Sequence, residues 1–168
     1  MNKALLFFLF LTLSTYSQHQ FVKINSAKTN NPTYVINNEI LISYEIFSKL
    51  KTKKVDNVNI IKYEVSSDEH KNHIPNLSEF GLIQIYTSET FKSKTQNELK
   101  LENDLPITAK LFLDGYYIDN PKYKIEIKSI NEIEIIKSDI EIILNIWTLP
   151  KNERQISLSG CSLSKKKE

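Results

Sequence analysis

The 168-residue chain has a single cysteine and only three glycines. One cysteine, Cys161, cannot form a disulfide within the chain, so burial of apolar side chains has to hold the fold together. So little glycine argues against the glycine-rich loops that bind phosphate groups in nucleotide-dependent proteins. The 22 basic and 20 acidic residues leave a net charge of +2, too small a field to attract nucleic acid or an anionic membrane surface. We therefore expect no nucleic-acid partner.

Long apolar runs are also lacking, apart from residues 4–13. That run follows the basic start Met1-Asn2-Lys3 and leads into small residues that end at Ser17. This order is typical of a secretory signal peptide, and a run of about ten apolar residues is too short for a spanning helix, which needs ~20. We expect cleavage near Ser17, so that the mature chain is periplasmic or secreted and does not insert stably into a membrane.

The chain does contain one pattern of eight residues that occurs twice. Residues 55–62 read Val-Asp-Asn-Val-Asn-Ile-Ile-Lys, and residues 130–137 read Ile-Asn-Glu-Ile-Glu-Ile-Ile-Lys. The flanking segments align as well, because residues 36–38 match residues 113–115 and residues 82–87 match residues 143–148. We interpret this similarity as an internal duplication. The alternative is that hydrophobic strands in a lysine-rich chain resemble one another by composition alone.

The hydrophobic patterning predicts an α+β fold made of two small β-α-β-β units with mixed sheets. In the first unit we expect strands at 33–36 and 39–42 around an Asn37-Asn38 turn, a helix over 44–51 capped by Ser43, and strands at 55–65 and 81–87. In the second we expect strands at 110–113 and 116–118 around an Asp114-Gly115 turn, a short helix over 123–128, and strands at 130–138 and 141–148. Each octet strand should pair with the strand that closes its unit.

Both faces of the strand at 55–65 are expected to be covered. In the second octet, Ile133, Ile135 and Ile136 should be buried on a central strand, and Glu134 should face water. Ile60 takes the place of Ile135 in the first octet.

The units divide the chain into consecutive segments. Residues 1–17 form the signal peptide, 18–32 an N-terminal arm or edge strand, 33–87 the first unit, 88–107 a linker, 108–149 the second unit and 150–168 a disordered tail. One edge strand is expected in the linker, around Leu99–Leu101.

The two units resemble a known family. Residues 33–39, 55–62 and 81–87 are similar in order and pattern to the plug domain of TonB-dependent outer-membrane receptors, where a strand and turn lead to a helix, an octet-like strand, and a strand that ends in threonine. Residues 111–115 and 130–137 resemble the same family. The resemblance implies two plug-like units without the barrel, and a location in the cell envelope. It implies no transport activity, because no hydrophobic energy-coupling box lies near the mature N-terminus.

No group of residues predicts a catalytic, cofactor-binding or metal site. His70 and His73, with Asp68 and Glu69, have a spacing that could present two imidazoles to a metal from one turn of helix. Lys71 adds a positive charge between them, so we favour a solvated loop.

Two other groups of side chains have alternative interpretations. Glu132 and Glu134 could act as paired acids, as in a glycosidase, or simply occupy the water-facing side of a strand. The aromatic side chains Tyr116, Tyr117, Tyr123 and Trp147 could form a surface for stacking sugars or binding protein, or could belong to the core.

The function that these observations favour is an exported, non-enzymatic interaction module of the cell envelope. It would use a plug-like scaffold to bind a protein partner in the envelope, without a cofactor. The alternative is a small secreted hydrolase or metal-dependent enzyme that uses the loop from Asp68 to His73.

Overall fold

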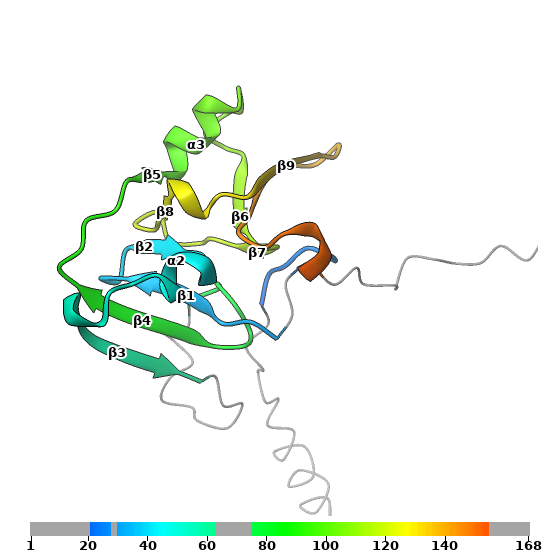
Figure 1. Cartoon of the computed structure of the whole chain (residues 1–168). Coiled ribbons are helices and arrows are strands. Elements are labelled where there is room, and N and C mark those ends of the chain that lie inside the picture. The colour runs from blue at the N-terminus through cyan, green and yellow to red at the C-terminus, as the bar shows by residue number, and fades with distance from the viewer. Residues whose placement is uncertain (1–20, 28–29, 63–74, 155–168) are drawn as a thin grey trace, which may run out of the picture.

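Two mixed β-sheets and a few short helices make up the fold, which confirms the predicted α+β class (Figure 1). The computed structural model describes residues 21–27, 30–62 and 75–154. The first sheet has the strand order β3-β4-β1-β2-β8-β5, and the second has the order β7-β6-β10-β9. The strands of the first sheet are β1 (Thr33–Ile36), β2 (Ile40–Ile42), β3 (Val55–Ile61), β4 (Leu82–Thr87), β5 (Ser93–Thr95) and β8 (Lys124–Glu126). Those of the second are β6 (Lys110–Leu113), β7 (Tyr116–Tyr117), β9 (Glu132–Lys137) and β10 (Ile142–Trp147). The helices are α2 (Tyr44–Ser48) and α3 (Gln96–Glu102), with 3-10 turns η1 (Thr52–Lys54), η3 (Ile127–Ser129) and η4 (Lys151–Glu153).

The two sheets repeat one arrangement of strands. β1 is antiparallel to β2 and parallel to β4, which is antiparallel to β3; β6, β7, β10 and β9 take the same places in the second sheet. The register repeats as well, since Val58 lies opposite Ile85 as Ile133 lies opposite Ile146. These are the residues that the alignment of the two units matches. The prediction that each octet strand pairs with the strand closing its unit is therefore confirmed.

Tight turns after the first strand of each unit form where the sequence predicts them. Asn37 and Asn38 have φ angles of 49° and 60°, and Asp114 and Gly115 have φ angles of 50° and 88°. A two-residue hairpin turn of this kind needs positive φ at both central positions, which asparagine, aspartate and glycine adopt at the lowest cost.

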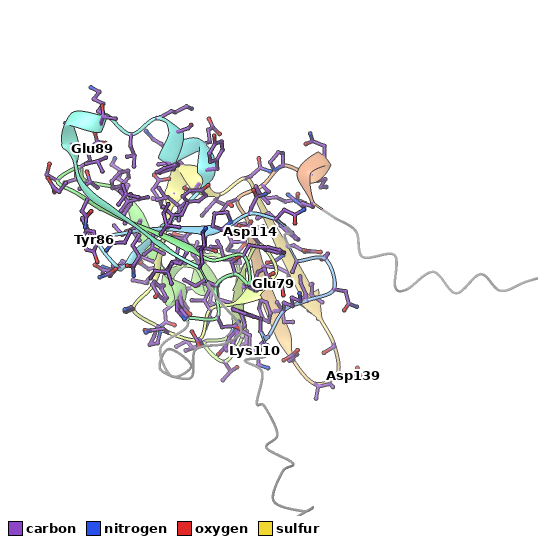
Figure 2. All side chains as sticks on the ribbon, turned by 90° about the horizontal axis from the view of Figure 1, so that it is seen from below. Glu79, Tyr86, Glu89, Lys110, Asp114 and Asp139 are labelled. Atoms are coloured by element: carbon purple, nitrogen blue, oxygen red, sulfur yellow. The ribbon has the colours of Figure 1, made fainter. Side chains whose placement is uncertain are left out.

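The first turn residue of each unit also fastens the closing strand. Asn37 Oδ1 accepts the backbone N–H of Thr87 at 3.1 Å, and Asn37 Nδ2 donates to the Thr87 carbonyl at 3.0 Å. In the second unit, Asp114 accepts the backbone N–H of Thr148 at 2.6 Å and the Thr148 hydroxyl at 2.7 Å. Asp114 is buried, and Figure 2 shows it well inside the outline of the molecule. The same turn position thus locks the parallel strand pair of both units.

Helix α2 begins at its predicted cap, where Ser43 Oγ accepts the N–H of Ile46 at 3.3 Å. It ends at Ser48, before the predicted Lys51, because the N–H of Lys49 closes the last turn on the Ile46 and Phe47 carbonyls. Phe47 stacks on Tyr34 of β1 with ring centroids 4.8 Å apart. The helix therefore covers one face of the six-stranded sheet.

The core lies on both faces of the six-stranded sheet. The face under α2 carries Tyr34, Ile36, Ile42 and Ile85. The opposite face packs against the four-stranded sheet, in one cluster that includes Val35, Leu41, Leu82, Ile125, Leu111, Leu113, Leu144 and Ile146. The layers are thus α2, the six-stranded sheet and the four-stranded sheet, with a core shared by both units.

The predicted helix over 123–128 is wrong. Lys124–Glu126 is strand β8, which pairs with β2 and β5, so a segment of the second unit completes the sheet of the first. Ile125 is fully buried in the shared core. Pairing along the open edge of β2 outweighs the local helix-start signal at residues 119–121.

An edge strand around Leu99–Leu101 is also wrong, because the segment 88–107 contains helix α3. Thr95 Oγ1 accepts the N–H of Glu98 at 3.2 Å, and Glu98 Oε2 accepts the N–H of Thr95 at 2.7 Å, which is a capping box. Leu99 is buried in the shared core. The segment is an integral part of the fold rather than a linker.

Parts of the predicted arm and tail pack on the four-stranded sheet. The N–H of Tyr117 donates to the Val22 carbonyl at 3.0 Å, and Lys23 forms an antiparallel bridge with Tyr116. Beyond Pro150, η4 leads to Arg154, which stacks on Trp147, so residues 150–154 are not the disordered tail that the sequence predicts. Within the described residues, no helix is both long and apolar enough to cross a membrane.

Candidate functional site

The two octet strands lie at the edges of their sheets. β3 is the outermost strand of the six-stranded sheet, and β9 is the outermost strand of the four-stranded sheet. The expectation of a buried, central octet strand is therefore wrong: Ile133 is 39% exposed, Ile135 41% and Ile60 67%. Alternating isoleucine and polar residues indicate a strand with two unlike faces, but they carry no signal for how many strands flank it.

Hydrogen bonds show which backbone groups of β3 point away from the sheet. The Ile85 carbonyl accepts the N–H of Asn37, so it is directed toward β1 and not toward β3. Val58, opposite Ile85, is then in a non-hydrogen-bonded position, and its N–H and C=O point outward. Because backbone groups alternate along a strand, those of Ile60 also point outward.

β9 presents the same backbone geometry. The Ile146 carbonyl accepts the N–H of Asp114 at 2.8 Å and is directed toward β6. Ile133, opposite Ile146, therefore turns its N–H and C=O outward, and so does Ile135. Among the described residues, no strand pairs with the outer edge of β3 or of β9. Each repeated octet thus offers a row of backbone groups that pairs with no other described strand, beside half-exposed aliphatic side chains. On β3 one of these groups, the Val58 N–H, donates to Asn57 Oδ1 of the same strand at 2.8 Å.

Glu134 is only partly exposed, and its carboxylate is not left to water as the sequence suggests. Its Oε2 accepts the side-chain amide of Asn145 at 3.1 Å and the indole N–H of Trp147 at 2.8 Å. Asn145 is fully buried, and its Oδ1 accepts the N–H of Gly115 at 3.0 Å. These bonds run from β9 through β10 to the turn after β6, and they fix the edge strand on the sheet.

Glu132 holds the start of β9 through a second set of contacts. Arg154 pairs with it at 2.8 Å, and Lys151 at 3.2 Å. The Arg154 guanidinium lies 4.3 Å from the ring centre of Trp147. Its hydrogen bond holds the pKa of Glu132 below the usual value. With Glu132 and Glu134 engaged in these contacts, their paired-acid interpretation has no structural support.

The aromatic residues singled out in the sequence belong mainly to the core. Tyr116, Tyr123 and Trp147 are buried, and only Tyr117 is partly exposed. Burial raises the pKa of Tyr116 and of Tyr123, as expected for phenols removed from water. They therefore form no sugar-stacking surface.

An open groove of about 670 Å³ lies beside the tip of the β9–β10 hairpin, near the labelled Lys110 and Asp139 (Figure 2). Lys110 pairs with Glu141 at 2.6 Å, so the two charges neutralise each other. Ser138 Oγ accepts the N–H of Glu141 at 3.1 Å and donates to the Glu141 carbonyl at 3.1 Å. The hydroxyl of Ser138 is therefore engaged in the hairpin turn.

The sequence-derived metal candidates Asp68, Glu69, His70 and His73 lie outside the described residues, as does Cys161. In the part of the chain that is described, no three His, Cys, Asp or Glu side chains come close enough to hold a metal ion. The free edges of β3 and β9 are the features best suited to binding. Comparisons with protein-family models, curated proteins and solved structures gave no match for this chain.

Proposed function

We propose that the chain is an exported, non-enzymatic interaction module of the cell envelope, which binds an extended segment of a partner protein at the edge of β9. The single observation that carries this proposal is the outer edge of β9, which no other strand of the described residues pairs with. Ile133 and Ile135 direct their backbone groups outward there, beside their own half-exposed side chains.

Strand addition to an exposed sheet edge is an established mode of peptide recognition. Main-chain hydrogen bonds supply affinity, and side chains at alternate positions supply specificity. On β9, Ile133 and Ile135 would contact alternate aliphatic side chains of the added strand, and Lys137 would favour an acidic residue at its end.

β9 is held in place before a partner arrives. Glu134 ties β9 to Asn145 and Trp147, and Arg154 pairs with Glu132, the first residue of the strand. A binding strand that is already fixed loses little conformational entropy on association, which favours affinity. These contacts therefore support a binding role for β9.

The signal-peptide pattern of residues 1–17 and the resemblance to receptor plug domains support an address in the envelope. The partner is accordingly a protein of that compartment with a segment that is free to extend. No cofactor enters this proposal.

Site-directed photocrosslinking in the producing cell tests the proposal. A photoreactive side chain at Lys137 should give a discrete protein adduct, whereas the same group at Ile107, an exposed isoleucine outside the edge strands, should not. Ile135→Pro removes one outward N–H without breaking the β9–β10 ladder, so it should abolish the adduct. Ile135→Val keeps the N–H and should retain it.

An adduct that survives Ile135→Pro, or a Lys137 probe that yields no more adduct than the Ile107 probe, would contradict the proposal. The emission of Trp147, the single tryptophan, shows whether each variant is folded. The enzyme alternative has its own measurement: the double substitution of His70 and His73 by alanine should leave bound zinc and folding unchanged.

A further inference from the structure

The edge of β3 differs from that of β9 in its charges. Val58 and Ile60 are exposed, and Asp56 and Lys62 at the two ends of the strand make no ion pair within the described residues. When two copies of such an edge lie antiparallel, the positive end of each copy faces the negative end of the other.

The register of such a reversed pairing can be worked out from the outward backbone groups. Two copies of β3 that run antiparallel about a two-fold axis at Asn59 place Val58 of each copy opposite Ile60 of the other. Both residues direct their N–H and C=O outward, so each Val58–Ile60 pair can exchange two backbone hydrogen bonds. The same register brings Asp56, at the bulge between Val55 and Asn57, near Lys62 of the other copy, which follows the last residue of the strand.

Side chains also match in this register. Val58 and Ile60 lie opposite Ile85 and Ile83, on the face that α2 covers. Across the axis, the Val58 and Ile60 side chains of the two copies would form one aliphatic row. The axis itself would bring together two Asn59 side chains, which can donate and accept hydrogen bonds.

β9 provides a comparison within the same molecule. Glu134 occupies the place of Asn59, and Asn131 the place of Asp56. The corresponding self-pairing of β9 would therefore place two Glu134 carboxylates against each other and would lose the pairing with Lys137. Like charges directly opposite each other destabilise a strand pair. Self-complementarity is thus a property of the first octet and not of the second.

We propose that β3 pairs with β3 of a second copy of this chain, so that two six-stranded sheets form one continuous sheet across a two-fold axis. Asn57 Oδ1 accepts the Val58 N–H at 2.8 Å in the single chain. Dimerisation replaces that local bond by the Ile60 carbonyl of the partner. The contact comprises one short strand per copy, so we expect a weak dimer that forms at micromolar concentrations or above. It leaves the edge of β9 free and is independent of the function proposed for it.

Sedimentation equilibrium of the exported chain, over concentrations up to the high micromolar range, tests the dimer. Lys62→Asp places an acid near Asp56 of the other copy on both sides of the two-fold axis. It should raise the dissociation constant about tenfold or more. Asp56→Lys should have the same effect. The double variant with both exchanges restores the opposite charges and should regain most of the affinity.

Asn59→Glu makes the β3 axis resemble β9 and should leave the chain monomeric. Because β9 already carries glutamate at this place on an edge strand, this variant is expected to fold, which its circular dichroism verifies. A wild-type chain that stays monomeric throughout, a dimer unaffected by Asn59→Glu, or a double variant as weak as the single ones would each overturn the proposal. Crosslinking at Lys137 is unaffected by these variants, so it reports on the β9 site separately.

Discussion

The sharpest test of how the second octet is packed compares the stability lost when Glu134 or its neighbour Ile135 is replaced by alanine. Replacing Glu134 by alanine removes the acceptor of two side-chain donors, Asn145 at 3.1 Å and Trp147 at 2.8 Å. Hydrogen bonds to a charged group contribute about 1.5–3 kcal/mol each, and the fully buried Asn145 amide would lose its partner without gaining water. Glu134 itself is partly exposed, so we expect a loss smaller than the sum of the two bonds, about 2–4 kcal/mol of unfolding free energy.

Replacing Ile135 by alanine should cost less. A fully buried isoleucine loses about 2–5 kcal/mol on truncation to alanine, but the side chain of Ile135 is 41% exposed and its removal leaves an open dent rather than a closed cavity. We expect about 1 kcal/mol, and less for Ile60→Ala on β3, which is more exposed.

Urea denaturation of the three variants, followed by tryptophan emission, measures these differences. Glu134→Gln is the matched control, because it keeps one oxygen acceptor and should lose less than half of what Glu134→Ala loses. Native emission should also change in Glu134→Ala but not in Ile135→Ala, since the indole N–H of Trp147 loses its acceptor only in the former. A larger loss for Ile135→Ala than for Glu134→Ala would refute the edge position of β9 and the role assigned to Glu134.

Three further predictions concern the turns and the C-terminal contact. Asp114→Ala should destabilise by about 2–4 kcal/mol because Thr148 loses two hydrogen bonds, whereas Asp114→Asn should lose much less, since Asn37 fills this place in the first unit; thermal unfolding compares them. Gly115→Ala should cost about 2–4 kcal/mol, because φ is 88° and a Cβ would lie 2.3 Å from the Ala27 Cα; denaturation midpoints show it, with Asn38→Gly as the tolerated counterpart. Arg154→Ala should remove stability that depends on pH, because the hydrogen bond with Arg154 lowers the pKa of Glu132 in the folded chain. The stability from this bond is present above the unfolded-state pKa of Glu132 and is lost as pH falls through the folded-state pKa. The difference in unfolding free energy between variant and wild type should therefore close in acid. A gap that widens in acid would exclude this coupling.

The features that could be predicted from the sequence are those that depend on neighbours in the chain. The turn at Asp114-Gly115 and the cap at Ser43 follow from the chemistry of one or two residues. The pairing of each octet strand with the strand that closes its unit, in the same register in both units, follows from the alignment of the two units. None of these features depends on which distant residues pack together.

The errors concern contacts between distant residues. The acceptor role of Glu134 depends on Asn145 and Trp147 across the strand pair, and periodicity alone cannot distinguish a carboxylate in such a network from one in water. Lys124–Glu126 form a strand because β2 has an edge to fill. Helix α3 was the exception, since the Thr95–Glu98 capping box was present in the sequence and could have identified it.

Strand β8 comes late in the chain but lies within the sheet that the first unit forms. Residues 30–62 are synthesised well before Lys124–Glu126, yet the six-stranded sheet closes only when that later segment lies beside β2 and Ile125 enters the core. Contacts between segments so far apart in sequence slow folding and make it depend on the whole chain. The two halves, although built to one plan, are therefore interleaved parts of a single cooperative unit, and neither is a module that evolution or an experimenter could transplant alone.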